Sequence, residues 1–309
     1  MNKESKIYVV GHRGLIGNTL IRQLKDRRYS NLVYASSSEV DLTNKEATRR
    51  FFADNRPEIV YFAAAVKGGV EEYSKFPVEY FEKNIQIEVN VINACYEFNV
   101  EKLLFVGASS IFPESFDKIV REDDFKSGWV QHGTEPYSLA KAAGTCLCEY
   151  YNTEYGTRFV TALLSNIYGL SDSDHFDRTS VIPALITRFI EARKGGKDEL
   201  AIWGDGSNRR EFLHVEDCAS ALIAIMESDI NAGTVNVGAG EMVSIDELAS
   251  IIAKETGFSG RITHDLSKPN GSRRSVLDIS RLKSIGWEKK IDLHKGIREI
   301  VKAIENGEL

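Results

Sequence analysis

The feature that most constrains the fold is a short apolar run that ends in three evenly spaced glycines. Residues 6–10, Lys-Ile-Tyr-Val-Val, are rich in β-branched side chains and predict a buried parallel strand. They lead directly into Gly11-His-Arg-Gly14-Leu-Ile-Gly17, after which residues 19–25 continue with helical spacing. A strand, a glycine turn and a helix in this order predict a βα unit whose turn can approach a phosphate group closely.

The same alternation of apolar runs and helical stretches continues through the first half of the chain. Strands are predicted at residues 31–35, 58–62, 103–107 and 159–164, and helices at 44–55, 78–98 and 135–154. Strands separated by helices predict an α/β fold with a doubly wound parallel sheet of the Rossmann type. Such a sheet binds its ligands at the carboxyl ends of the strands.

The regular alternation of predicted strands and helices ends after Gly169. A polar stretch follows, and then a more irregular succession of helices and short apolar runs. We therefore expect residues 1–169 to form a dinucleotide-binding domain. Residues 170–309 are expected to form mainly a smaller α/β substrate domain, with segments of about 207–238 and 275–282 returning to the first domain.

The predicted cofactor site combines the glycine turn with the ends of the later strands. Its expected members are Gly11, Arg13, Gly14, Leu15, Ile16 and Gly17 in the turn, and Asp41, Leu42, Ala63, Ala64, Lys141 and Asn166 beyond it. The second strand ends in Ala35-Ser-Ser-Ser38, with no acidic residue before Glu39 to hold a ribose 2′-hydroxyl. Arg13 could instead meet a 2′-phosphate, so NADP(H) is favoured over NAD.

Composition argues against several other classes of protein. The formal net charge of −6 disfavours a general nucleic-acid binder, and no apolar run approaches the ~20 residues of a membrane span. The first residues lack the apolar core of a signal peptide, so we expect a cytoplasmic protein. Paired metal-site spacing is missing among the cysteines, so reduced thiols and no metal are expected at Cys95, Cys146, Cys148 and Cys218.

Tyr137 and Lys141 stand four residues apart in a segment with helical spacing. On a helix, both side chains would project from one face, about one turn apart. An ammonium group beside a phenol favours the phenolate, so Lys141 is expected to lower the pKa of Tyr137 from its usual ~10. Many surface helices carry such a pair, and its chemical meaning therefore depends on the rest of the chain.

Basic side chains recur in the second half of this acidic chain. Arg188, Arg210 and the loop at residues 268–274 stand out. Arginine can hold a diphosphate through two parallel hydrogen bonds, which suits a small phosphorylated ligand. The same residues would also be ordinary as solvated surface charges.

Together, the glycine turn, the Tyr-x-x-x-Lys pair and the variable C-terminal part resemble an extended short-chain dehydrogenase/reductase. The closer resemblance is to the GDP-L-fucose synthase family and runs nearly end to end. It rests on Gly11-His-Arg-Gly14, Thr134-Glu-Pro-Tyr137, Val181-Ile-Pro-Ala-Leu185, Trp203-Gly-Asp-Gly206, Arg210-Glu-Phe-Leu-His214 and Ser267-Lys-Pro269.

This resemblance implies reduction of the C4 ketone of a GDP-linked 4-keto-6-deoxy sugar by NADPH. It implies that Tyr137 protonates the forming alkoxide and that Lys141 holds the nicotinamide ribose. The GDP-sugar would be held by Arg188, Trp203, Arg210 and Asn270. A homodimer built on the helices near 78–98 and 135–154 is also implied.

Three positions depart from the family pattern in ways that concern the chemistry. Ala108 stands at the usual triad serine, Ser110 at the family cysteine and Ser180 at the family histidine. That cysteine and histidine are, by resemblance, the base and acid that epimerise the carbons beside the ketone. A serine hydroxyl is too weakly acidic for either role without a separate activating base. We therefore expect reduction without epimerisation, of a hexose or a heptose.

Two alternatives remain open from the sequence. In the first, the protein epimerises and reduces like the family, with another residue such as His175 doing the proton transfer. In the second, it is a non-catalytic NADP-binding protein, in which Ala108 reflects the loss of the catalytic site. The retained Tyr137 and Lys141 speak against the second alternative.

A serine after the fourth strand can replace the missing triad hydroxyl. If residues 108–110 are extended, Ala108 and Ser110 share one face and Ser109 points to the other. Ser110 is then expected to donate a hydrogen bond to the ketone oxygen, with Ser109 as the second choice.

Overall fold

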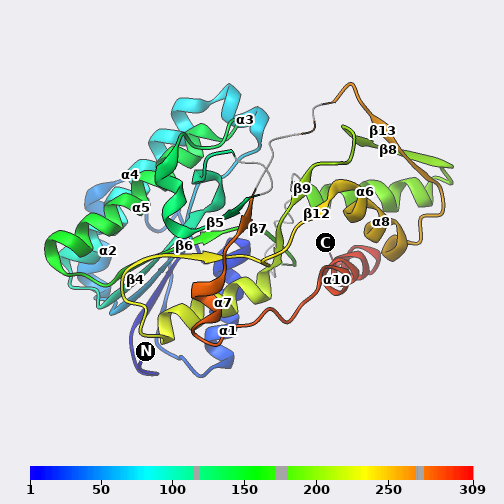
Figure 1. The fold of residues 1–309 in the computed structure, drawn as a ribbon. Helices are drawn as coiled ribbons and strands as arrows, with labels where there is room; N and C mark the ends of the chain where they lie inside the picture. Colours follow the sequence, from blue (N-terminus) through cyan, green and yellow to red (C-terminus); the bar gives the residue numbers. More distant parts are fainter. Residues whose placement is uncertain (115–117, 171–179, 269, 271–274, 309) are drawn as a thin grey trace.

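The computed structural model describes residues 1–114, 118–170, 180–268, 270 and 275–308. At its centre lies a parallel sheet of six strands in the order β11-β6-β4-β3-β1-β2 (Figure 1). Its strands are β1 (Ile7–Val10), β2 (Leu32–Val33), β3 (Ile59–Phe62), β4 (Lys102–Ala108), β6 (Phe159–Leu164) and β11 (Gly233–Val237). The predicted doubly wound α/β fold is confirmed.

The strand order creates a switch point beside β1. The chain goes from β1 to β2 on one side and then returns to β3 on the other side of β1. At such a point the connections after neighbouring strands diverge, and the edge of the sheet is left open to a ligand. The glycine turn that follows β1 lies at this point.

Helices cover both faces of the sheet, because both faces of its strands are apolar. On β1, Ile7 and Val9 face α1 (Leu15–Asp26) and α7 (Val215–Glu227). Tyr8 and Val10 belong to the opposite face, which is covered by α2 (Lys45–Asn55), α4 (Pro77–Glu97) and α5 (Glu135–Tyr155) (Figure 1). This alternation is the period-2 pattern of a strand buried on both sides.

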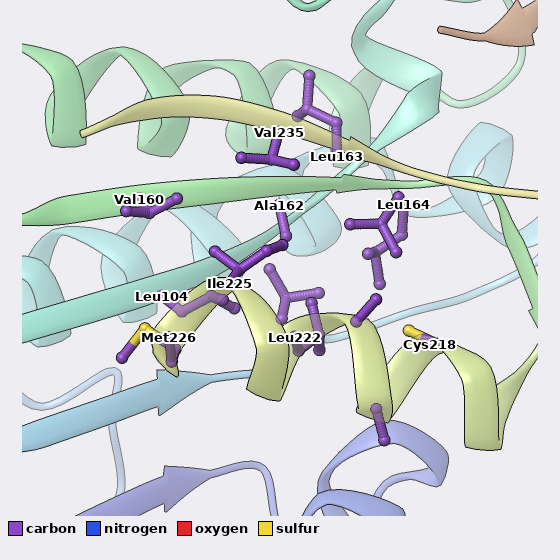
Figure 2. Close-up of a cluster of buried hydrophobic side chains, with 14 of the residues drawn as sticks. Leu104, Val160, Ala162, Leu163, Leu164, Cys218, Leu222, Ile225, Met226 and Val235 are labelled. Atoms are coloured by element: carbon purple, nitrogen blue, oxygen red, sulfur yellow. The ribbon is translucent and has the colours of Figure 1, made fainter. Parts of the chain in front are cut away.

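Figure 2 shows the apolar layer between α7 and the sheet. From α7 come Cys218, Leu222, Ile225 and Met226, and from β4, β6 and β11 come Leu104, Val160, Ala162, Leu164 and Val235. Lys102, at the start of β4, donates hydrogen bonds to the carbonyl oxygens of Ile225, Met226 and Ser228, at 3.1, 3.2 and 3.0 Å. A buried lysine thus satisfies carbonyl groups at the C-terminal end of α7, which lack partners within the helix.

A second group of elements has an apolar cluster of its own. α6 (Val181–Lys194), α8 (Ile245–Thr256) and α10 (Leu293–Glu305) pack together beside the parallel pair β8 (Glu199–Trp203) and β13 (Arg261–Asp265) (Figure 1). The chain returns from this group to the main sheet, since β11 adds its sixth strand next to β6.

Short elements complete the described structure. The strand pairs are β7 (Asn166–Tyr168) with β10 (Phe212–His214), β9 (Arg209–Arg210) with β12 (Val243–Ser244), and β5 (Ile119–Val120) with β14 (Val276–Leu277). The short helices are α3 (Val70–Lys75) and α9 (Ser280–Lys283), with 3-10 turns at Ser109–Ile111 and Glu122–Ser127. Across the ranges described, none of the helices is long and apolar enough to cross a bilayer.

Candidate active site

The glycine turn between β1 and α1 is held by close backbone packing. Gly11 has φ +86°, and a Cβ atom at this position would lie 2.6 Å from the backbone nitrogen of Ala64. A Cβ at Gly17 would collide with the carbonyl oxygen of Gly11. By contrast, a Cβ at Gly14 would meet only that oxygen, at 3.5 Å. Two of the glycines are therefore required by the fold, while Gly14 borders open space.

This turn fits a dinucleotide pyrophosphate. Gly14 is the N-cap of α1 and offers no side-chain cap, so the first N–H groups of the helix are not satisfied by a capping side chain. Such groups, together with the helix dipole, bind phosphate at the N-terminus of a helix. Arg13 is exposed in the same turn, and Leu15 and Ile16 begin the helix behind it.

The other predicted cofactor residues follow strands of the sheet. Ala63 donates its N–H to Val10 at 2.9 Å, so the ends of β1 and β3 lie side by side. The Asp41 carboxylate accepts hydrogen bonds from the backbone and hydroxyl of Thr43, and the Leu42 carbonyl accepts one from Asn90 on α4. The Asn166 side chain donates to the carbonyl of Glu211 at 2.8 Å, tying β7 to β10. Contact of these residues with a cofactor stays a prediction.

α5 places Tyr137 and Lys141 together, as the spacing predicts. The Lys141 Nζ lies 5.8 Å from the centroid of the Tyr137 ring. The Lys141 side chain is buried, with its Nζ 3.2 Å from Oε1 of Glu88 and 4.5 Å from the centroid of the Phe105 ring. The Tyr137 ring stacks on Tyr73 of α3, with centroids 5.9 Å apart.

The predicted lowering of the Tyr137 pKa is wrong for this structure. Burial chiefly, together with Tyr73 and Glu88, raises the pKa of Tyr137 above the ordinary value of a phenol. The positive charge of Lys141 does not reverse this effect, because the adjacent Glu88 carboxylate offsets it. A raised pKa keeps the phenol protonated near neutral pH, as a proton donor requires.

The extended conformation assumed for residues 108–110 is also wrong. β4 ends at Ala108, and Ser109–Ile111 form a 3-10 turn that Phe112 closes by donating its N–H to Ser109 at 3.1 Å. The strand alternation that ranked Ser110 above Ser109 therefore does not apply.

The two serines have different surroundings. Ser110 is buried, and its hydroxyl accepts a hydrogen bond of 2.8 Å from Ser138 on α5, one residue after Tyr137. The Ser138 hydroxyl lies 2.9 Å from that of Thr134, which completes a chain of three hydroxyl groups. Ser109 is partly exposed and lines a small cavity with Phe112, Pro113, Val120, Gln131, Ser275 and Leu277.

The residues expected to hold a nucleotide gather around β8 and β9. Arg188 on α6 donates a 2.5 Å hydrogen bond to the carbonyl of Ala201 on β8, whose last residue, Trp203, is 60% exposed. Asn270 accepts the N–H of Asp205 at 2.7 Å.

Arg210 belongs to the same group. Asn208 donates to the Asn270 carbonyl, and Arg210 donates to Asn208 at 2.8 Å. The structure thus connects Asn270 with Arg210 through Asn208, and Trp203 with Arg188 through β8.

Ser180 and His175 are two further positions that the family resemblance singled out. Ser180, which stands at the family histidine, is the N-cap of α6. His175, the alternative proton-transfer residue, lies outside the described residues. Where side chains are described, no group of three or more His, Cys, Asp or Glu residues is arranged to hold a metal ion.

Sequence reasoning missed Glu88, Tyr73 and Ser138, which contact the predicted catalytic residues. Tyr73 and Ser138 carry no distinctive local signal. Glu88 does, because it is a charged residue between Ile87 and Val91 on the buried face of α4. A carboxylate on an apolar helix face indicates a buried partner.

A parallel sheet with a glycine turn at its switch point and a Tyr-x-x-x-Lys helix beside it defines an extended short-chain dehydrogenase/reductase. More specifically, the chain belongs to the NAD dependent epimerase/dehydratase family, whose model matches residues 7–238.

Three known proteins are similar over nearly their full lengths. The GDP-L-fucose synthase of Escherichia coli (strain K12) is 38% identical over 306 residues, which span 96% of this chain and 95% of that protein. A GDP-mannoheptose C4 reductase from Campylobacter jejuni, solved with NADP bound, superposes with a TM-score of 0.90 at 32% identity and 99% coverage of both chains. A GDP-6-OMe-4-keto-L-xylo-heptose reductase from C. jejuni superposes with a TM-score of 0.88 at 30% identity, again covering 99% of both chains.

The packing of the glycine turn predicts different effects for alanine substitutions at Gly14 and at Gly17. Gly14→Ala should leave the melting temperature unchanged and weaken NADPH binding about tenfold, because its methyl group enters the space next to the helix N-terminus. Gly17→Ala should instead lower the melting temperature, because its methyl group collides with the Gly11 carbonyl. Thermal unfolding and NADPH fluorescence titration measure both effects. Equal NADPH affinity in Gly14→Ala and the wild type would argue against a pyrophosphate at this turn.

Proposed function

We propose that this protein is an NADPH-dependent reductase that converts the C4 ketone of a GDP-linked 4-keto-6-deoxy sugar, hexose or heptose, into an alcohol without epimerising it. One observation carries the proposal. The chain keeps Tyr137 and Lys141 side by side on α5. At two positions where the fucose synthase resemblance implies an epimerising base and acid, it has the hydroxyl residues Ser110 and Ser180.

The similar proteins support this activity. Both C. jejuni proteins are named as reductases of GDP-linked heptoses, and one of them was solved with NADP bound. A GDP-linked sugar is named for both neighbours and for the E. coli relative, and the NADP bound in one neighbour supports an oxidoreductase that uses NADP(H).

The end of β2 supports NADP over NAD. Glu39, the first acidic residue after this strand, folds back to accept hydrogen bonds from the backbone and hydroxyl of Ser36, at 2.7 and 2.6 Å. These bonds, and to a smaller extent Arg13, hold the pKa of Glu39 below its usual value. The carboxylate is engaged in its own turn, and Arg13 is exposed nearby to meet a 2′-phosphate.

The proposed roles follow from where the side chains lie. NADPH, when bound, supplies the hydride for C4. Tyr137 gives its phenolic proton to the oxygen that develops negative charge, and its raised pKa keeps that proton in place beforehand. Lys141 holds the nicotinamide ribose, and the glycine turn holds the pyrophosphate.

Ser110 is assigned to polarise the ketone. Because Ser138 donates to the Ser110 oxygen, the hydrogen of the Ser110 hydroxyl is directed away from Ser138. An oriented donor of this kind stabilises the negative charge that develops on the ketone oxygen. Ser109, which is less buried, is the second choice.

The nucleotide part of the substrate is assigned to the group around β8 and β9. Trp203 is exposed enough to stack on a base, and Lys268 lies 5.5 Å from the centroid of its ring. Arg188 and Arg210 suit the diphosphate, with Asn270 beside them. Residues 170–309 would then form mainly the substrate domain, while segments 207–238 and 275–282 contribute to the cofactor domain of residues 1–169.

The proposed homodimer would use α4 and α5. These helices pack against each other and expose apolar and aromatic side chains, namely Val78, Phe81, Val89, Tyr96, Tyr150 and Tyr155. Exposed apolar side chains on two adjacent long helices are typical of an interface between subunits. The cytoplasmic location expected from the sequence stays a prediction.

The bifunctional alternative has an observation in its favour. Relatives named GDP-L-fucose synthase share up to 38% identity with the chain. In that case a residue other than Ser110 and Ser180 would remove the protons beside the ketone.

Tyr137→Phe should lower turnover of the keto-sugar at least about a thousandfold, because the proton donor is lost. NADPH binding should stay within about twofold of the wild type, because the phenol oxygen is the only atom removed. NADPH oxidation with a panel of nucleotide-linked 4-keto-6-deoxy sugars measures the first quantity, and fluorescence titration the second. Tyr150→Phe, which removes the same hydroxyl from an exposed tyrosine of the same helix, is the matched control. Retained turnover in Tyr137→Phe would refute the proton-donor role.

Incubation in deuterated water distinguishes reduction alone from epimerisation with reduction. We expect a product without deuterium at the two carbons that flank C4, because Ser110 and Ser180 are too weakly acidic to exchange those protons. The E. coli GDP-L-fucose synthase run in parallel serves as the positive control. Rapid enzyme-dependent incorporation at either carbon would establish the bifunctional alternative.

Paired alanine variants decide which serine polarises the ketone. Ser110→Ala should lower kcat about tenfold or more while leaving NADPH binding unchanged, because it removes one hydrogen bond to the developing charge. Ser109→Ala should have a smaller effect. The reverse ranking would assign the role to the partly exposed Ser109.

A further inference from the structure

Glu88 is a buried carboxylate that the proposed chemistry does not use. It lies on the inner face of α4, with 1% of its side chain exposed. Its Oε1 is 3.2 Å from the Nζ of Lys141, whose side chain is 2% exposed. The ammonium group also lies 4.5 Å from the centroid of the Phe105 ring and 5.9 Å from that of Phe62. The pair thus sits in an apolar environment between α4, α5 and the sheet.

α5 has space for this carboxylate. A Cβ at Gly144, one turn after Lys141, would lie 2.5 Å from Oε2 of Glu88 and 2.7 Å from the Phe105 ring. Glu88 therefore packs against the one position of this turn that has no side chain. The carboxylate is held in a fitted space, which fixes its place relative to Lys141.

A buried ammonium group needs such a partner to stay charged. Burial disfavours the charged form of lysine and lowers its pKa, whereas an opposite charge nearby restores it. Removing one partner of a buried pair leaves an uncompensated charge, at a large cost. Without Glu88, the ammonium group of Lys141 would therefore be uncompensated, and its proposed hydrogen bond to the ribose would be weakened.

We infer that Glu88 is a positioning residue, which keeps Lys141 charged and directed beside Tyr137. The inference rests on the proposed function for the contact between Lys141 and the nicotinamide ribose. Burial raises the pKa of Glu88 to about 7 against the opposing effect of Lys141. Among the described residues, Tyr137 and Cys148 also interact electrostatically with Glu88, and Tyr73 interacts with Tyr137.

Glu88→Gln tests the charge with little change of shape. At pH 8.5 this variant should bind NADPH about tenfold more weakly than the wild type, because the buried ammonium group of Lys141 lacks the charged partner that Glu88 supplies in the wild type. At pH 6.5 the loss should be less than about threefold, because burial raises the pKa of Glu88 to about 7 and the wild-type carboxyl, largely protonated there, resembles the glutamine. NADPH fluorescence titration at both pH values measures this. Glu82→Gln, a change on the exposed face of the same helix, should have no effect at either pH.

A double variant shows whether Glu88 acts through Lys141. In a Lys141→Met background, Glu88→Gln should weaken NADPH binding no further, because the charge it serves is absent. An equal loss at both pH values, an undiminished effect in the Lys141→Met background, or unchanged binding in Glu88→Gln would overturn the inference. If Glu88→Gln melts too low to assay, Lys141→Met in the same chain should restore the melting temperature; failure to do so would also overturn it.

The binding measurement is independent of the sugar. If no keto-sugar is reduced by the wild type, the proposed function fails while the pH dependence of NADPH binding still reports on Glu88. If Lys141→Met binds NADPH as the wild type does, the ribose contact and this inference fall together, and the reductase assay still depends on Tyr137.

Discussion

The close approach of the β1–α1 turn to the end of β3 sets the geometry of the whole site. Gly11 lies against the backbone of Ala64, and Gly17 lies against the carbonyl of Gly11, with no room for a Cβ atom at either position. Because α1 starts directly from this turn, its first N–H groups face the sheet edge where the parallel strands end. The residues after β4 lie at that edge as well, so one packing constraint brings the proposed phosphate site and the proposed reaction site to the same side of the molecule.

Charge compensation between the buried Lys141 and Glu88 side chains is a second constraint on the site. Lys141 is buried among aromatic rings, and Glu88 lies next to it. The pair presents little net charge to Tyr137, whose pKa is therefore governed by burial rather than by the lysine. A tyrosine with a raised pKa holds its proton near neutral pH, which suits the donor of a reduction. In the proposed reduction, Lys141 would then serve to bind the cofactor, with its charge compensated by Glu88, and would not acidify the phenol.

Hydroxyl groups dominate the side of the site where the family resemblance implies stronger acids and bases. Ser110, Ser138 and Thr134 form a chain that can orient hydrogen bonds. Such groups stabilise developing charge without removing protons from carbon. These hydroxyl groups are thus consistent with the proposed reduction without epimerisation.

The sequence by itself determined the alternation of strands and helices, the glycine turn and the Tyr137/Lys141 pair. These are local patterns, in which a strand apolar on both faces or a helical spacing of four residues is visible along the chain. β11 was not recognised as a strand, because Thr234 and Asn236 interrupt its apolar run. α7 was not recognised either, because it is buried on most of its surface and so shows little periodicity.

Tertiary structure alone decided the surroundings of the Tyr137/Lys141 pair. Glu88 reaches Lys141 from another helix, far away in the sequence, and no local pattern specifies such a contact. The 3-10 turn at Ser109 replaced the extended strand that the sequence suggested, because the chain leaves the sheet at Ala108 and closes a hydrogen-bonded turn. Local periodicity predicts which residues share an element, but the charge and burial of a site depend on the packing of elements distant in the chain.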